Sequence, residues 1–199
     1  MARLVTLVVL LAAVFAILTT GPLAARDPGR LPQTRALPSS HTARFGARMQ
    51  ALWRGIVTDS VSSAMPAFFP RAAYLQVKAI VNPAADYRDR LVGAFRADIR
   101  AAHQLLGPRA RKARLDGVFV PARWRWIDPG QCFNRVGYWH APGSRVEYDE
   151  GGRVSSFGIF SFISWRGEWY VVHLARFDRP GTVLDPAAGR GSYGPAGGC

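Results

Sequence analysis

Hydrophobic positions along the chain fall into three zones that differ in their spacing. The first zone, residues 4–18, is an almost unbroken apolar run, and no charged residue follows it until Arg26. In the second zone, from Thr42 onward, apolar residues recur every three or four positions, as in amphipathic helices. In the third zone, from Gly117 onward, aromatic and β-branched residues alternate with polar ones, as in strands. The pattern predicts an α+β fold behind an N-terminal apolar helix.

The second zone predicts two or three helices. The first begins after Thr42 and ends before Pro66, and its apolar stripe consists of Phe45, Met49, Leu52, Ile56 and Val57. The last is capped by Asp86 and stops at Gly107, and its stripe consists of Tyr87, Leu91, Phe95, Ile99 and Ala102. Each stripe provides one face that can pack on a sheet.

The third zone predicts one curved antiparallel sheet of four to five strands. The expected strands are residues 117–127, 133–140, 144–148, 153–165 and 168–176, and short glycine-containing turns join them. A two-residue turn at Arg166 and Gly167 places Trp165 opposite Glu168. The same register places Ile163 opposite Tyr170, Ser161 opposite Val172 and Ile159 opposite Leu174. We expect this row to face the helices.

The alternate row of the same strands is both aromatic and polar. We expect it to form a ligand or partner face, with these residues: Tyr138, Phe160, Phe162, Trp169 and Val171. A solvated face would not carry Phe160, Phe162 and Trp169 together, so a pocket or another chain is expected to cover it.

Residues 4–25 contain no charged side chain. A run of this length can cross a bilayer, which takes roughly 20 residues, and it also has the zones of a secretory signal peptide. Both interpretations remain open, and both place the domain outside the cytoplasmic membrane, either anchored or secreted. Because Arg26, Arg30 and Arg35 follow the run, a reversed anchor with a cytoplasmic domain is the alternative orientation.

The sequence divides into four parts. Residues 1–25 form the signal peptide or membrane anchor, and residues 26–41, rich in proline and arginine, form an extended linker. Residues 42–177 form one domain, and residues 178–199 form an irregular tail rich in glycine and proline. The length is sufficient for one hydrophobic core.

Charge adds an attraction to anionic partners. The formal net charge is +13, and all of the 26 basic residues except Lys78 and Lys112 are arginines. These arginines are scattered and form no basic run, which argues against specific nucleic-acid recognition.

The order of elements resembles the cone-shaped nuclear-transport-factor-like and cystatin-like folds. Residues 42–176 carry the resemblance, with two helices before a sheet that ends in the long hairpin FGIFSFISWRGEWYVVHL. With the apolar segment in front, the layout is similar to exported actinobacterial proteins, including those associated with mammalian-cell-entry transport systems. The stretches AYLQVKAI and GYWH also resemble bacterial proteins without an assigned activity. The resemblance implies a pocket but no particular ligand, because such folds host enzymes, binding proteins and oligomerisation modules.

The candidates for acid–base catalysis are His140, Glu147 and His173. A histidine next to a carboxylate in a dry pocket can act as a general base. The expected register places His173 opposite Phe160 and His140 opposite Arg145, so the two histidines need not meet. The alternative interpretation is structural: cross-strand pairs of His140 with Arg145 and of Tyr138 with Glu147.

The two cysteines, Cys132 and Cys199, form a disulfide bond if the domain is exported. Free thiols or a bridge between two copies are the alternatives. No close pair of histidines or cysteines suggests a metal site, and no cofactor is expected.

These observations lead to a non-catalytic extracytoplasmic domain that binds a ligand or takes part in an assembly. The alternatives are a small-pocket acid–base enzyme, either a hydrolase or an isomerase, and a polyanion-binding surface protein. The expected partners are the membrane, through residues 4–25, and either a second copy of the chain or another component of the cell envelope.

Overall fold

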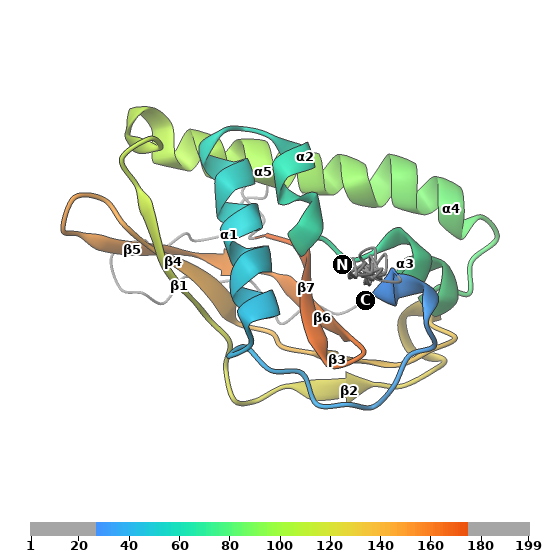
Figure 1. Ribbon diagram of the computed structural model, residues 1–199. Coiled ribbons are helices and arrows are strands. Elements are labelled where there is room, and N and C mark those ends of the chain that lie inside the picture. The colour runs from blue at the N-terminus through green and yellow to red at the C-terminus, as the bar shows by residue number, and fades with distance from the viewer. Residues whose placement is uncertain (1–26, 175–199) are drawn as a thin grey trace, which may run out of the picture.

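The computed structural model describes residues 27–174, and its first long element is helix α1 (Ala43–Val57) (Figure 1). The side chain of Thr42 caps this helix by accepting a hydrogen bond from the Phe45 amide at 3.0 Å. The predicted stripe is buried at Phe45, Met49, Leu52 and Ile56, which confirms the helix and the face that it buries.

Two short helices, α2 (Val61–Ala64) and α3 (Arg71–Val77), lead to a long one. The long helix runs through α4 (Pro83–Asp86), a π-helical segment (Tyr87–Leu91) and α5 (Val92–Leu106). Its buried stripe is the predicted one. Its N-cap, however, is Asn82, whose side chain accepts a hydrogen bond from the Ala85 amide at 3.0 Å. Asp86 does not cap the helix because the helix begins one turn earlier, and the Asp86 amide already donates to the Asn82 carbonyl; the Asp86 carboxylate binds the side chain of Arg90.

The strands form two antiparallel sheets, so the α+β class is confirmed and the single sheet is wrong. One sheet has the order β1 (Arg114–Phe119), β4 (Ser144–Asp149) and β5 (Val154–Ile159). The other has the order β2 (Arg125–Ile127), β3 (Tyr138–His140), β6 (Ser161–Trp165) and β7 (Glu168–His173). Short 3-10 turns complete the chain: Pro28–Arg30, Met65–Ala67, Gly107–Arg109 and Gln131–Phe133.

Two of the expected strands are divided between the two sheets. Residues 153–165 become β5 and β6, and the chain passes from one sheet to the other at Phe160. Residues 117–127 become β1 and β2, with Pro121 between them, where it has no amide hydrogen to donate to a ladder. Strands β3 and β4 also belong to different sheets, so the turn at residues 141–143 is not a hairpin.

The register follows the prediction only near the β6–β7 turn. Trp165 lies opposite Glu168 and Ile163 opposite Tyr170, as expected. A bulge then places Ser161 opposite His173 instead of Val172. Ile159 does not face Leu174, because it pairs with Ser144 in the other sheet.

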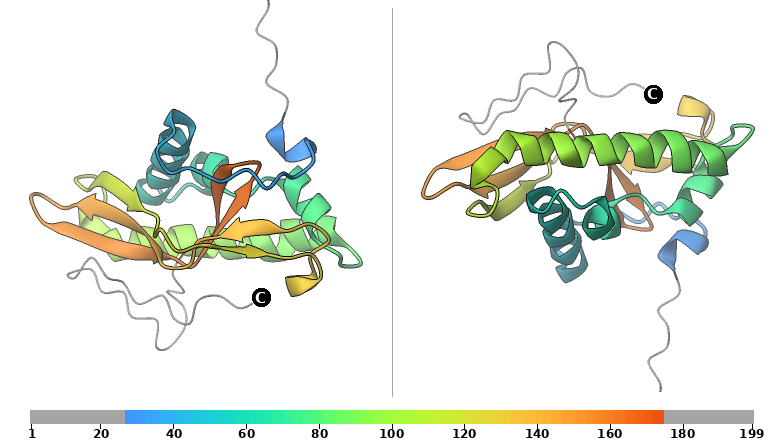
Figure 2. Two further views of the ribbon diagram at one scale, coloured as in Figure 1. Left: turned by 90° about the horizontal axis from the view of Figure 1, so that it is seen from below. Right: turned by 90° about the horizontal axis from the view of Figure 1, so that it is seen from above.

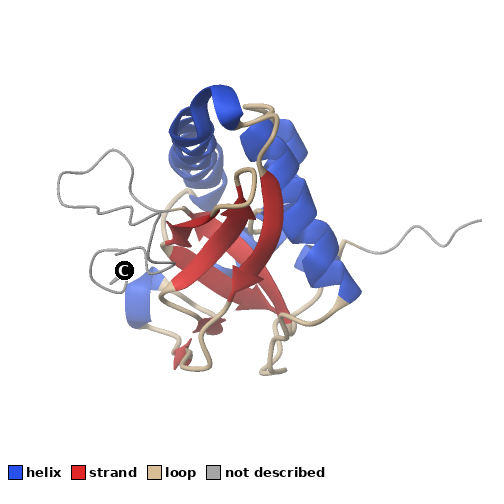
Figure 3. Ribbon diagram, turned by 90° about the vertical axis from the view of Figure 1, so that its left-hand side faces the viewer, coloured by secondary structure: helices blue, strands red, loops and turns tan. Residues whose placement is uncertain are grey.

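The larger helices gather on one side of the strands (Figure 3), and the long helix runs across both sheets (Figure 2). Aromatic rings fill the space between them. Phe68 stacks on Phe95 of α5 with ring centroids 4.3 Å apart, and Phe45 of α1 contacts Phe162 of β6 at 6.1 Å. One core therefore joins the helices to both sheets.

The segment expected to be a free linker is extended but bound to the fold. The side-chain amide of Gln33 donates to the carbonyls of Gly137 and Ser164, at 3.2 Å each, and its oxygen accepts from the Arg166 amide at 2.7 Å. The Trp165 indole donates to the Pro28 carbonyl at 2.9 Å. The fold therefore includes residues 27–41.

None of the helices within residues 27–174 is both long enough and apolar enough to cross a membrane. The expected anchor or signal peptide, the tail and Cys199 lie outside the described residues, so the predictions about them, including the disulfide bond, stay predictions.

Candidate functional site

His140 is a buried histidine at the end of β3. It lies opposite Arg125 of β2 and opposite Ile163 of β6, and it is 5% exposed. Burial, and secondarily the charge of Arg125, lower the pKa of His140 to about 4. The imidazole is therefore neutral at pH 7.

The predicted partners of His140 are elsewhere. Glu147 lies in the other sheet, opposite Gly117 and Ser156, and Arg145 lies opposite Phe119 and Gly158. Tyr138, expected opposite Glu147, pairs with Ile127. Both expected cross-strand pairs are wrong, because β3 and β4 do not form a hairpin. Glu147 is also not placed to orient His140.

His173 has a carboxylate neighbour that the sequence did not suggest. Its Nδ1 atom lies 3.5 Å from Oδ2 of Asp98 on α5, a distance beyond the usual range of a hydrogen bond. The same Oδ2 atom accepts from the Leu174 amide at 3.0 Å. Asp98 therefore fastens the end of β7 to the long helix. His140 is two strands away, because β6 separates β3 from β7.

The expected ligand or partner face is part of the core. Phe162 and Val171 are fully buried, Trp169 is 1% exposed and Phe160 is 9% exposed. Phe162 and Trp169 stack with centroids 5.4 Å apart, and Trp169 contacts Trp124 at 5.8 Å. This chain itself, through α1 and the tryptophans near β2, covers a face that was expected to bind a ligand or another chain.

The opposite face of the β6–β7 hairpin is covered as well. Phe69 packs edge-on against Trp165 and Tyr170, with centroids 6.0 Å apart in each case. Large aromatic side chains on both faces of the hairpin are thus buried, which explains why apolar residues occur in both rows.

Aromatic and cationic side chains lie instead around β2, one of the two edge strands of the four-stranded sheet. We term this surface the β2 edge; it comprises Arg35, Arg123, Trp124, Arg125, Trp126 and Trp139. The three tryptophans are half-buried, and the three arginines are exposed. Arginine and tryptophan alternate at residues 123–126, and the sequence alone does not distinguish this pattern from an ordinary half-buried strand.

The rings of the β2 edge contact one another, and one guanidinium group, that of Arg35, lies against them. Trp139 meets Trp124 and Trp126 nearly at right angles, with centroids 5.0 and 5.2 Å apart. The guanidinium of Arg35 lies 4.8 Å from the Trp126 ring and 3.6 Å from the Asp128 carboxylate. On the other face of the strand, Arg125 lies opposite His140.

One donor in the β2 edge is not satisfied. Nε1 of Trp126 is buried and has no hydrogen-bond partner. A buried donor without an acceptor costs about 1–3 kcal/mol.

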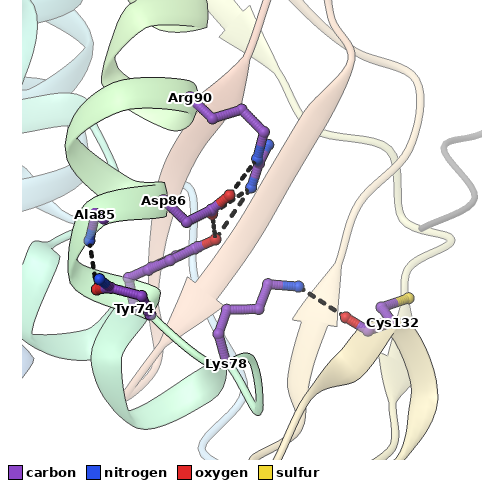
Figure 4. A network of polar contacts seen from close by, with 7 residues as sticks. Tyr74, Lys78, Ala85, Asp86, Arg90 and Cys132 are labelled. Atoms are coloured by element: carbon purple, nitrogen blue, oxygen red, sulfur yellow. Dashed lines mark hydrogen bonds and ion pairs between the residues drawn. The ribbon is translucent and has the colours of Figure 1, made fainter.

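A second polar cluster holds the loop at residues 130–135 against the end of α3 (Figure 4). Nζ of Lys78 donates to the Cys132 carbonyl at 2.8 Å and to Oδ1 of Asn134 at 2.9 Å. Burial, followed by the charge of Arg90, lowers the pKa of Lys78. Cys132 and Phe133 both have a φ of 56°, which is uncommon for residues with a side chain. The lysine thus stabilises an unusual loop conformation.

Tyr74, Asp86 and Arg90 form a network beside this loop (Figure 4). Nε and Nη2 of Arg90 donate to the two carboxylate oxygens of Asp86 at 2.6 and 2.7 Å, and Nη2 also donates to the Tyr74 hydroxyl at 3.0 Å. The Tyr74 hydroxyl donates to Asp86. Burial and Asp86 raise the pKa of Tyr74, so the phenol keeps its proton. The network joins α3 to the long helix.

The described residues contain no group of three or more metal-ligating side chains. Comparison with known proteins found no matching family model, no matching curated protein and no matching solved structure. The resemblance to the cone-shaped folds therefore stays a prediction.

Proposed function

We propose that this chain is a non-catalytic binding or assembly domain outside the cytoplasmic membrane, and that it contacts a partner protein of the cell envelope through the β2 edge. The observation that carries the proposal is the group of three half-buried tryptophans around β2, with Arg35 over the ring of Trp126 and two further exposed arginines, Arg123 and Arg125, in the same stretch of chain. Tryptophan and arginine are the residues most enriched at the energetic centres of protein interfaces. The apolar, uncharged run at residues 4–25 supports the location.

The arrangement of the histidines supports a non-catalytic role. His140 is neutral at pH 7 and lies next to a cation, Arg125, which opposes the protonation that a general base must undergo. The carboxylate of Asp98, beside His173, also accepts a hydrogen bond from the Leu174 amide. This bond gives the carboxylate a structural role.

The chemistry of the β2 edge favours a partner surface that carries carboxylates. Contacts with Trp126 and Asp128 orient Arg35 before any partner arrives, so little side-chain entropy is lost on binding. A guanidinium pairs with a carboxylate through two parallel hydrogen bonds. The net charge of +13 adds long-range attraction to an acidic partner.

The test compares two charge reversals in the full chain, expressed in its native host with an affinity tag. Arg123→Glu with Arg125→Glu alters the β2 edge. Arg111→Glu with Arg114→Glu changes the charge equally at exposed positions outside the four-stranded sheet that contains β2. After cross-linking in intact cells, we expect the first variant to lose a specific envelope protein that the wild type and the second variant retain. Equal loss from both would contradict the proposal and favour general polyanion binding.

The location is tested separately. Alkaline phosphatase fused after Cys199 is expected to be active, because this enzyme requires an oxidising compartment. Activity of a cytoplasmic reporter at the same position, with no phosphatase activity, would contradict the extracytoplasmic location.

A further inference from the structure

One end of the domain exposes two apolar side chains on neighbouring loops. Val81 is fully exposed and Phe133 is 72% exposed, more than any other large hydrophobic residue in the part of the chain that the structure describes. The loops are neighbours because the amide of Ala79, two residues before Val81, donates to the Phe133 carbonyl at 2.8 Å and Lys78 pairs with Asn134. Exposed apolar side chains grouped in this way mark an interaction surface.

The loop that carries Phe133 is fixed in this exposed position. Besides the two hydrogen bonds from Lys78, the guanidinium of Arg135 donates to the carbonyls of Leu75 and Lys78 at 3.0 and 2.7 Å. The positive φ of Phe133 is held by these contacts. The aromatic ring is thus displayed to solvent by bonds to α3 and does not fold back onto the core.

The same helix also holds the start of the described chain. Nε2 of Gln76 donates to the Gly29 carbonyl at 2.6 Å, and a side chain at Gly29 would come within 2.9 Å of Pro70. Lys78, which binds the loop of Phe133, follows Gln76 by two residues. The described chain therefore begins against the helix whose C-terminal end holds the loop of Phe133.

The side of the domain that carries these apolar residues also carries exposed arginines. Arg135 follows Phe133 by two residues, Arg71 begins α3, and Arg30 lies in the segment that Gln76 of α3 holds. The nearby carboxylates are already paired: Asp27 with Arg30, Asp86 with Arg90 and Asp89 with Arg88. Exposed apolar side chains with arginines beside them are typical of proteins that contact the interface of an anionic membrane.

We propose that this end of the domain rests on the surface of the membrane that the N-terminal apolar segment enters, with Phe133 and Val81 among the lipid headgroups and the arginines beside the phosphates. The inference depends on the proposed extracytoplasmic, membrane-associated location. It concerns a surface other than the β2 edge, so each can fail without the other. The occupant is a lipid surface because the chain arrives at this end directly from an uncharged run that can span a bilayer.

The experiment uses the full chain, N-terminal segment included, reconstituted into vesicles of phosphatidylglycerol and phosphatidylcholine with brominated acyl chains, which quench tryptophan fluorescence. Phe133→Trp and Val81→Trp each add one indole at the proposed contact. Val154→Trp and Phe119→Trp add one at the exposed apolar positions of β5 and β1. The long helix spans residues 83–106, about 36 Å, and separates Val81 from the opposite end of the domain.

Relative to the wild-type background, we expect the added fluorescence at positions 133 and 81 to be quenched at least threefold more than at positions 154 and 119. Equal quenching at all four positions, or stronger quenching at 154 and 119, would overturn the inference. Circular dichroism of the four variants verifies that each is folded. The vesicles contain no partner protein, so the result is independent of whether the β2 edge binds one.

Discussion

His140 lies directly opposite Arg125, and the pairing brings a buried imidazole next to a permanent positive charge. Protonating His140 would place a second cation in a site that is 5% exposed. The pKa of about 4 follows from this placement, and it makes the stability of the domain depend on pH.

We expect the free energy of unfolding to decrease as the pH falls from about 6.5 to about 4. In this window the unfolded chain binds a proton at residue 140 and the folded chain does not, so acid favours unfolding. The loss attributable to His140 is about 3 kcal/mol. Urea unfolding at a series of pH values measures it. His140→Gln should reduce the dependence of the unfolding free energy on pH in this window. The same substitution at exposed His41 should leave that dependence unchanged. A profile that His140→Gln leaves unchanged would refute the assignment.

Asp86→Asn should weaken the attachment of α3 to the long helix. The carboxylate accepts hydrogen bonds from both Arg90 and Tyr74, and we expect a loss of about 1–3 kcal/mol. The hydrogen bonds from Arg90 lower the pKa of Asp86, so this contribution is present above about pH 4 and is lost as the pH falls through the lowered pKa. Asp89→Asn, at an exposed carboxylate paired with Arg88, is the control. Equal effects of the two substitutions on the urea midpoint would show that the network contributes nothing specific.

Trp169→Ala and Phe162→Ala should destabilise the domain by about 3–5 kcal/mol each, because both rings are buried and stacked on one another. Thermal unfolding measures the effect. Phe133→Ala, at an exposed ring, should leave the transition temperature nearly unchanged. If Trp169→Ala proved harmless to stability, the ring could not belong to the core.

Gln33→Ala should loosen the N-terminal segment from the sheet. One side chain makes three hydrogen bonds to backbone atoms of residues 137, 164 and 166, and their loss is expected to cost about 1–3 kcal/mol. Hydrogen exchange of the Arg166 amide, which donates to Gln33, should accelerate. Thr34→Ala, at an exposed neighbour, should leave that amide protected. Unchanged exchange in Gln33→Ala would mean that the segment is not attached through this residue.

The helices were predictable because their stripes repeat locally. Phe45, Met49, Leu52 and Ile56 share a face whatever the rest of the chain does. The division into two sheets was not predictable, since nothing around Phe160 distinguishes a strand that continues from one that passes to another sheet. The alternation from Phe160 to Trp165 assigns the side chains to two faces of the strand. It does not show which elements pack on each face.

The candidate site was less accessible to sequence reasoning than the fold. Asp98 approaches His173 from a helix far away in the sequence, and Lys78 reaches the carbonyl of Cys132 across a similar gap. No local spacing signals such contacts. The pair of Asp86 and Arg90 could have been found, because residues four apart on a helix face each other.

The attachment of residues 27–41 has a mechanical consequence. A force on Asp27 acts first on the hydrogen bonds from Trp165 to the Pro28 carbonyl and from Gln76 to the Gly29 carbonyl. It then acts on the bond between Gln33 and the Arg166 amide in the β6–β7 turn. These contacts leave residues 27–33 no free length, so a load applied at Asp27 bears on α3 and the hairpin before it reaches α1. A force on Asp27 is therefore expected to turn the sheet together with the segment that it pulls.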